Sequence, residues 1–133
     1  MGSTQRVDAR SGTFARVVAG IGGVALVVFG VWAMIAPESF FEELAQFEPY
    51  NQHFIQDIGA FQIGLGAVLL LALMRPSGGA LGVALVGVGI GAAAHVASHA
   101  VGTDLGGTPA VDIPFFSILA GAFLAAGFLS WRR

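Results

Sequence analysis

The chain has 133 residues, of which 56% are hydrophobic and only 11% are charged, and its formal net charge is −2. A soluble domain of this size carries about a quarter of charged residues and lacks the interior volume to bury so much apolar surface. This composition excludes a soluble globular domain and indicates a protein of the lipid bilayer. The absence of cysteine excludes disulfides and thiolate metal sites, and no basic patch indicates nucleic acid as a partner.

Four apolar stretches, each long enough to cross a bilayer, follow a polar N-terminal tail at 1–13. We expect the beginning of that tail to be disordered and the first span to stop before Pro37. Asn51 is the predicted N-cap of the second span, and residues 75–79 form a tight turn before the third. The predicted spans are 14–36, 53–74, 80–101 and 113–131. The predicted fold class is all-α, an integral membrane four-helix bundle.

Between the first two spans, Phe40, Leu44 and Phe47 recur at helical spacing with Glu42, Glu43 and Gln46 between them. This pattern predicts a short amphipathic helix that lies in the membrane interface. We expect this acidic, Phe-rich segment to cover the pocket described below.

The charged residues divide between the two sides of this arrangement. All six basic residues are arginines, and they fall before the first span, between the second and third, and after the fourth. Every acidic residue except Asp8 lies in or beside the other two loops. Since arginine-rich segments stay in the cytoplasm, we predict that both termini are cytoplasmic. The absence of lysine beside abundant Gly, Ala and Val is typical of a GC-rich bacterial genome, so the predicted location is the inner (plasma) membrane.

Three residues within the spans are predicted to serve helix packing. Gly87 and Gly91 form a small-xxx-small pattern in the third span, which lets another helix approach closely, either inside the bundle or in a homo-oligomer. Gln62, deep in the second span, is expected to hydrogen-bond to Ser117 or to a backbone carbonyl of another helix.

Two pairs of ionisable residues lie within the second and third spans, where lipid makes them costly and where they are commonly functional. His53 and Asp57 are four residues apart and share a helix face, and so do His95 and His99. The two spans are joined by a short turn and run antiparallel. A rise of about 1.5 Å per residue from that turn places both pairs at a common depth near the extracytoplasmic end. The sequence therefore predicts that the four side chains meet.

Three imidazoles and one carboxylate are suitable ligands for a divalent transition metal such as Zn, Cu or Fe. The predicted metal ligands are His53, Asp57, His95 and His99. Four acidic residues predicted on the same side could add a ligand or orient a histidine; they are Glu42, Glu43, Asp104 and Asp112. A purely structural role stays open, in which His53 pairs with Asp57 and the other histidines bond to neighbouring helices or headgroups.

Several segments resemble a group of uncharacterised actinobacterial four-helix membrane proteins, whose general build is similar to the DoxX-like class. The segments are Ala36-Pro37-Glu38-Ser39-Phe40-Phe41, Pro49-Tyr50-Asn51-Gln52-His53, Asp57-Ile58-Gly59-Ala60 and His95-xxx-His99, and the resemblance as a whole covers about residues 15–130. That group has Arg immediately before the aspartate, whereas this chain has Gln56, which removes one charge beside Asp57. DoxX relatives are associated with quinone-linked sulfur oxidation and with redox membrane complexes, so the resemblance implies at most a redox-accessory role.

The sequence contains no nucleophile elbow, zinc-protease motif or Gly-rich phosphate loop, which disfavours an enzyme without deciding the question. Our hypothesis is a small binding or redox-accessory protein of the lipid bilayer that holds a transition metal in an extracytoplasmic His/Asp pocket. One alternative is a structural or assembly subunit of a larger membrane complex with no ligand. Another is a quinone-reactive or proton-relay protein that uses His and Asp as proton carriers.

Overall fold

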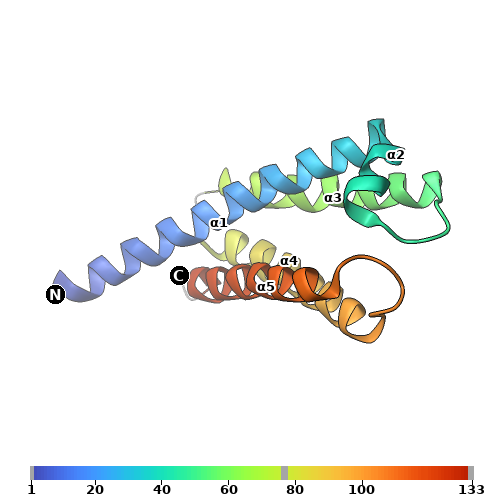
Figure 1. Cartoon of the computed structure of the whole chain (residues 1–133). Coiled ribbons are helices and arrows are strands. Elements are labelled where there is room, and N and C mark those ends of the chain that lie inside the picture. The colour runs from blue at the N-terminus through green and yellow to red at the C-terminus, as the bar shows by residue number, and fades with distance from the viewer. Residues whose placement is uncertain (1, 76–77, 132–133) are drawn as a thin grey trace.

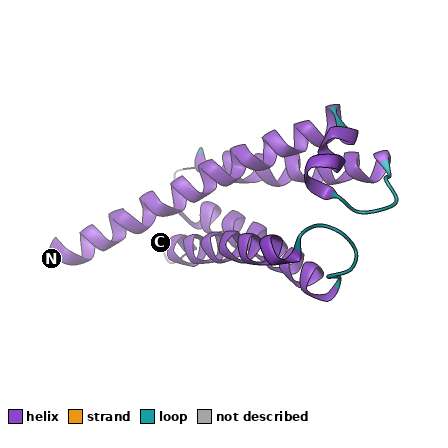
Figure 2. Ribbon diagram, in the orientation of Figure 1, coloured by secondary structure: helices purple, strands orange, loops and turns teal. Residues whose placement is uncertain are grey.

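The computed structural model describes the backbone of residues 2–75 and 78–131 and the side chains of residues 12–75 and 79–131 (Figure 1). This part of the chain is helical, with short connecting loops (Figure 2). Its elements are α1 (Gly2–Ile35), α2 (Pro37–Phe40), the π-helical turn η1 (Phe41–Ala45), α3 (Gln52–Leu73), α4 (Gly78–Val101) and α5 (Pro109–Trp131). The four segments long and apolar enough to cross a membrane are Gly12–Ile35, Gln52–Leu73, Gly79–Val101 and Pro109–Trp131. The predicted all-α class with four spans is confirmed.

The N-terminal residues differ from the prediction. The helix extends through the predicted tail, because α1 begins at Gly2 and projects beyond the other helices (Figure 1); disorder at the start of the tail stays a prediction. Extending a helix that already exists costs far less than starting one, and residues 2–13 contain no proline to stop it.

Proline and an asparagine cap set the boundaries on either side of the first connection. α1 ends at Ile35, one residue before the predicted end, because a residue that precedes proline avoids the helical region. Ala36 accordingly has φ −139° and ψ 62°. The predicted N-cap is confirmed, since the Asn51 side chain accepts a hydrogen bond from the Phe54 N–H at 3.1 Å.

The last helix starts four residues before its predicted beginning. The Thr108 carbonyl accepts hydrogen bonds from the N–H groups of Val111 and Asp112, and Pro109 occupies the first helical position, where it is favoured. Asp112 therefore lies in the first turn of α5, whereas the sequence placed it in the loop. Within the predicted turn at 75–79, Pro76 and Ser77 lie outside the described residues, as do the two C-terminal arginines.

Glycines spaced seven residues apart join α1 to α3. A Cβ atom added to Gly30 would lie 2.6 Å from the Gly59 carbonyl oxygen, and one added to Gly66 would lie 2.7 Å from the Gly23 carbonyl oxygen. Seven residues return to the same helix face after two turns. Gly23 and Gly30 therefore face Gly66 and Gly59 in antiparallel order, and the two backbones touch.

A second seam of the same kind joins α4 to α5. A Cβ atom on Gly82 would lie 2.7 Å from the Trp131 backbone nitrogen, and one on Gly127 would lie 3.1 Å from the Gly82 carbonyl oxygen. By contrast, Gly87 and Gly91 are exposed and have no atom within 4 Å of an added Cβ. Their predicted role in packing inside the bundle is wrong, because they lie on the opposite face of α4. A contact between copies of the chain stays a prediction.

The two hairpins, α1–α3 and α4–α5, share a core only in the half of the bundle that contains both chain ends. All four long helices contribute to that core through residues such as Ala19, Leu69, Leu85 and Phe123. Towards the other half the hairpins diverge (Figure 1). A separate cluster there, built on Ala33, Phe40 and Ile55, belongs to the α1–α3 hairpin alone.

The Phe-rich segment forms the end of the α1–α3 hairpin. Its helical part stops at Ala45, because Gln46 adopts the left-handed conformation with φ 45°. Phe47, which the prediction included in the helix, therefore lies beyond its end. Phe40 is buried, and its ring packs edge-on against Trp32 of α1 with ring centroids 5.5 Å apart. The segment thus covers α1 and α3. Its location in the membrane interface stays a prediction.

The bundle has a small-residue interior and a large apolar exterior. Ala15, Ala19 and Ala126 are fully buried, whereas Phe61 and Ile118 are 75% and 72% exposed. Each such side chain would lose about 1.5–3 kcal/mol of burial free energy if it faced water. Lipid removes that cost, and the chain is therefore a multi-pass integral membrane protein.

Candidate functional site

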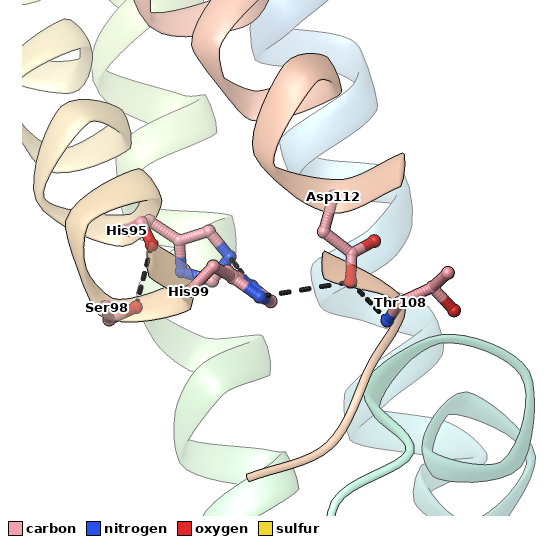
Figure 3. A network of polar contacts seen from close by, with 5 residues as sticks. All are labelled: His95, Ser98, His99, Thr108 and Asp112. Atoms are coloured by element: carbon pink, nitrogen blue, oxygen red, sulfur yellow. Dashed lines mark hydrogen bonds and ion pairs between the residues drawn. The ribbon is translucent and has the colours of Figure 1, made fainter. Parts of the chain in front are cut away.

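Three ionisable side chains meet where α4 ends and α5 begins, and we call His95, His99 and Asp112 the His–Asp cluster (Figure 3). The two histidines occupy the last two turns of α4, four residues apart, so the helix itself brings their rings onto one face. Asp112 comes from the first turn of α5. Residues 102–108 connect the two helices and bring the carboxylate to the imidazoles.

The two imidazoles contact each other through the same type of nitrogen. His95 Nε2 and His99 Nε2 are 3.1 Å apart, and the ring centroids are 4.7 Å apart. At this distance one nitrogen must donate a hydrogen bond and the other must accept it, so the pair holds one proton between the two Nε2 atoms. The contact leaves no room for a hydrogen on both Nε2 atoms at once. The two nitrogens point toward the same position, and a cation could bind there in place of the proton that they share.

The opposite side of His99 faces the carboxylate. His99 Nδ1 lies 3.8 Å from Asp112 Oδ2, and these side chains are only 21% and 26% exposed. The Thr108 N–H donates a hydrogen bond to the same Oδ2 at 2.6 Å. The first turn of a helix also favours an anion, so a carboxylate suits this position.

Phe116 fixes the rings of both histidines. Its ring stacks on His99 with centroids 5.6 Å apart and an interplanar angle of 22°, and it lies edge-on to His95 at 4.5 Å. It follows Asp112 by one helical turn, so one face of α5 supplies both the carboxylate and the aromatic ring.

Gly107 leaves the space that Asp112 needs. It adopts φ +74°, and an added Cβ would lie 2.7 Å from Asp112 Oδ2 and 3.6 Å from His99 Cε1. Both the positive φ and the close approach require glycine at this position.

The other predicted pair stands apart from this cluster. His53 Nε2 lies 3.7 Å from Asp57 Oδ2, and the two side chains are 87% and 53% exposed at the beginning of α3. Each predicted pair therefore forms within its own helix. Within the described residues, however, no interaction joins the two pairs, and no three His, Asp or Glu side chains form a group that could hold a metal ion. The divergence of α3 from α4 at this end explains the separation.

Of the acidic residues predicted to orient a histidine, the structure brings one to the site. Asp112 contacts His99, whereas Glu42, Glu43 and Asp104 are exposed on the surface. Gln62, predicted to bond another helix, has a buried Oε1 atom that finds no hydrogen-bond partner in the described part of the chain.

Sequence reasoning missed Phe116, Gly107 and the role of Thr108. The dipeptide Thr108-Pro109 is a helix-start signature, and it could have placed Asp112 and Phe116 on one face of α5. Nothing in the sequence indicated the ring stacking.

The spacing of the two Nε2 atoms fits a shared metal ion. Two nitrogens bound at about 2.0–2.1 Å to one tetrahedral ion stand about 3.3 Å apart. The observed 3.1 Å is within a small side-chain adjustment of that value. Asp112 behind His99 reproduces the carboxylate–histidine–metal arrangement that orients metal-binding imidazoles.

No protein-family model, curated protein or solved structure matches this chain in the three comparisons. The resemblance to DoxX-like proteins therefore stays a prediction, and a functional argument has to come from the His–Asp cluster itself.

Proposed function

We propose that this protein binds a divalent transition metal through His95 Nε2 and His99 Nε2 and acts as a small binding or redox-accessory protein of a bacterial inner membrane. The Asp112 carboxylate, whose Oδ2 lies 3.8 Å from His99 Nδ1, favours the tautomer that carries its proton on Nδ1 and presents Nε2 to the metal. The single observation that supports this most is the 3.1 Å contact between the two Nε2 atoms.

The rest of the coordination sphere would be completed from outside the cluster. Two imidazoles leave at least two positions of a tetrahedral ion for water or an exogenous ligand. Such an open site suits a carrier or an accessory protein better than a closed structural site. His53 and Asp57 are not part of this proposal, because they lie on the other hairpin.

The charge distribution supports a cation as the ligand. Arg75 follows α3 at the end of the bundle where α4 begins, whereas the His–Asp cluster lies at the opposite end, where α4 ends and α5 begins and where the loops carry acidic residues. With both termini cytoplasmic, as the arginines predict, the cluster opens toward the extracytoplasmic side. An acidic surface raises the local concentration of cations there.

Metal content of the purified protein tests the proposal. We expect about one Zn, Cu or Fe per chain in protein purified without chelators, and loss of that metal in the His95→Ala/His99→Ala variant. The matched control is His53→Ala/Asp57→Ala, which removes an i,i+4 pair from the other hairpin and should keep the metal. Protein without stoichiometric metal, and without any response to added Zn²⁺, Cu²⁺ or Fe²⁺, would refute the proposal.

Proton transfer is a second candidate function, and the shared proton between His95 and His99 favours it. Asp112, His99 and His95 follow one another as carboxylate, imidazole and imidazole, with contacts of 3.8 Å and 3.1 Å, which is the order of groups in a proton relay. A quinone-reduction assay distinguishes the two functions. Activity that survives metal removal but falls in Asp112→Asn would favour the relay.

A further inference from the structure

Residues 102–108 contact both hairpins at the end where the hairpins diverge. The Gly107 N–H donates a hydrogen bond to the Gln46 carbonyl oxygen at 3.4 Å. A Cβ atom on Gly106 would lie 2.6 Å from the same oxygen and 2.9 Å from Phe47 Cα. The loop backbone is therefore packed directly on the last turn of η1.

Two backbone conformations make this close packing possible. Gly106 has φ +119°, a conformation that only glycine adopts without strain. Gln46 has φ 45° and ends η1 there, and its side-chain amide donates to the Glu42 carbonyl at 3.1 Å. The positive φ angles of Gly106 and Gln46 thus allow the two segments to approach each other this closely.

The same loop contacts the His–Asp cluster one residue further on. Gly107 lies against Asp112 and His99, and the Thr108 N–H bonds Asp112 Oδ2 at 2.6 Å. Residues 106–108 therefore lead from Gln46 of one hairpin to the carboxylate of the other.

We propose that residues 102–108 form a strap through which metal occupation of His95 and His99 controls docking of the α1–α3 hairpin. This inference rests on the proposed function. A metal on His99 Nε2 would make the Nδ1–H a stronger donor and draw it toward Asp112 Oδ2, which lies 3.8 Å away, and this would hold Asp112, Thr108 and Gly107 more firmly. Gly107 then donates to Gln46 from a fixed position, and the two hairpins are held together at their open end.

The coupling must act in both directions. If metal binding strengthens the strap contact by some factor, an intact strap strengthens metal binding by the same factor. A change that breaks the contact at Gln46 without touching the cluster should therefore weaken metal binding.

Gly106→Ala is that change, because the three atoms nearest to its added Cβ all belong to Gln46 and Phe47. The matched control is Gly121→Ala on α5, where an added Cβ has open space around it. Zn²⁺ affinity is measured by titration calorimetry, and amide hydrogen exchange of residues 41–50 is followed with and without Zn²⁺. Helical content by circular dichroism verifies that each variant is folded.

We expect Zn²⁺ to slow exchange of residues 41–50 in the parent chain and in Gly121→Ala. In Gly106→Ala that protection should disappear, and Zn²⁺ affinity should fall by about fivefold or more. Equal Zn²⁺ affinity in Gly106→Ala and the parent, or unchanged exchange of residues 41–50 in the parent on adding Zn²⁺, would overturn the strap and leave the metal site standing. A parent chain that binds no Zn²⁺, Cu²⁺ or Fe²⁺ would refute the metal site and the strap together.

Discussion

Replacing Gly30 by Ala should destabilise the bundle far more than the same substitution elsewhere on a helix. The added Cβ would lie 2.6 Å from the Gly59 carbonyl oxygen, 2.8 Å from Ile63 Cγ1 and 2.9 Å from the Ile63 backbone nitrogen. Two of these neighbours are backbone atoms of α3, so no side-chain rotation relieves the clash. The whole of α1 must move away from α3.

The magnitude follows from a matched pair of variants. Gly64→Ala is the control, because no atom lies within 4 Å of the added Cβ on α3. Both substitutions gain up to about 1 kcal/mol of helix propensity, and this gain cancels in the comparison. Overpacking costs about 1–3 kcal/mol, and the backbone contacts place Gly30→Ala at the upper end. We expect the two variants to differ by about 3 kcal/mol.

Reversible unfolding by dodecyl sulfate in detergent micelles, followed by circular dichroism, measures this difference. Trp32 lies on α1 two residues beyond the substitution, so its fluorescence reports on the same region of the seam. Gly59→Ala should produce a similar loss, and the double variant should lose less than the sum, since both changes separate the same two backbones. Equal stability of Gly30→Ala and Gly64→Ala would refute the glycine seam.

Three further changes test the cluster and a helix cap. Asp112→Asn should lower Zn²⁺ affinity by about 10–100-fold, as loss of a carboxylate behind a metal-binding histidine does. Titration calorimetry measures the affinity, and an equal loss in Asp57→Asn would contradict the role of Asp112 behind His99. Phe116→Leu should weaken Zn²⁺ binding by the stacking energy of about 0.5–1.5 kcal/mol, and unchanged affinity in the same titration would show that the ring does not fix the histidines. Asn51→Ala should cost about 1 kcal/mol of stability through loss of the N-cap, measured by the same dodecyl sulfate unfolding.

The sequence was sufficient for features that depend on one helix at a time. Apolar length located the four spans, and the i,i+4 spacing correctly paired His53 with Asp57 and His95 with His99. The asparagine cap of α3 was predictable for the same reason, because it is a contact across three residues.

Features that depend on which helices are neighbours were harder to predict. The two histidine pairs were expected to meet because equal depth was taken to imply contact between α3 and α4. In the structure the closest partners are α1 with α3 and α4 with α5, and the glycines that line the α1–α3 contact are seven residues apart on each helix. A search for the i,i+4 pattern alone found Gly87 and Gly91, which face outward.

The His–Asp cluster is consequently a property of the α4–α5 hairpin alone. Its two imidazoles share one helix, its carboxylate and aromatic ring share the next, and the Gly82–Gly127 seam sets the distance between those helices. The α1–α3 hairpin reaches the cluster through the Gln46 contact with residues 106 and 107. A site built on one hairpin and touched by the other through a loop can keep its ligands while the hairpins shift. Because that loop contact is the link between the cluster and the α1–α3 hairpin, occupation of the proposed metal site would reach the rest of the bundle through residues 106 and 107.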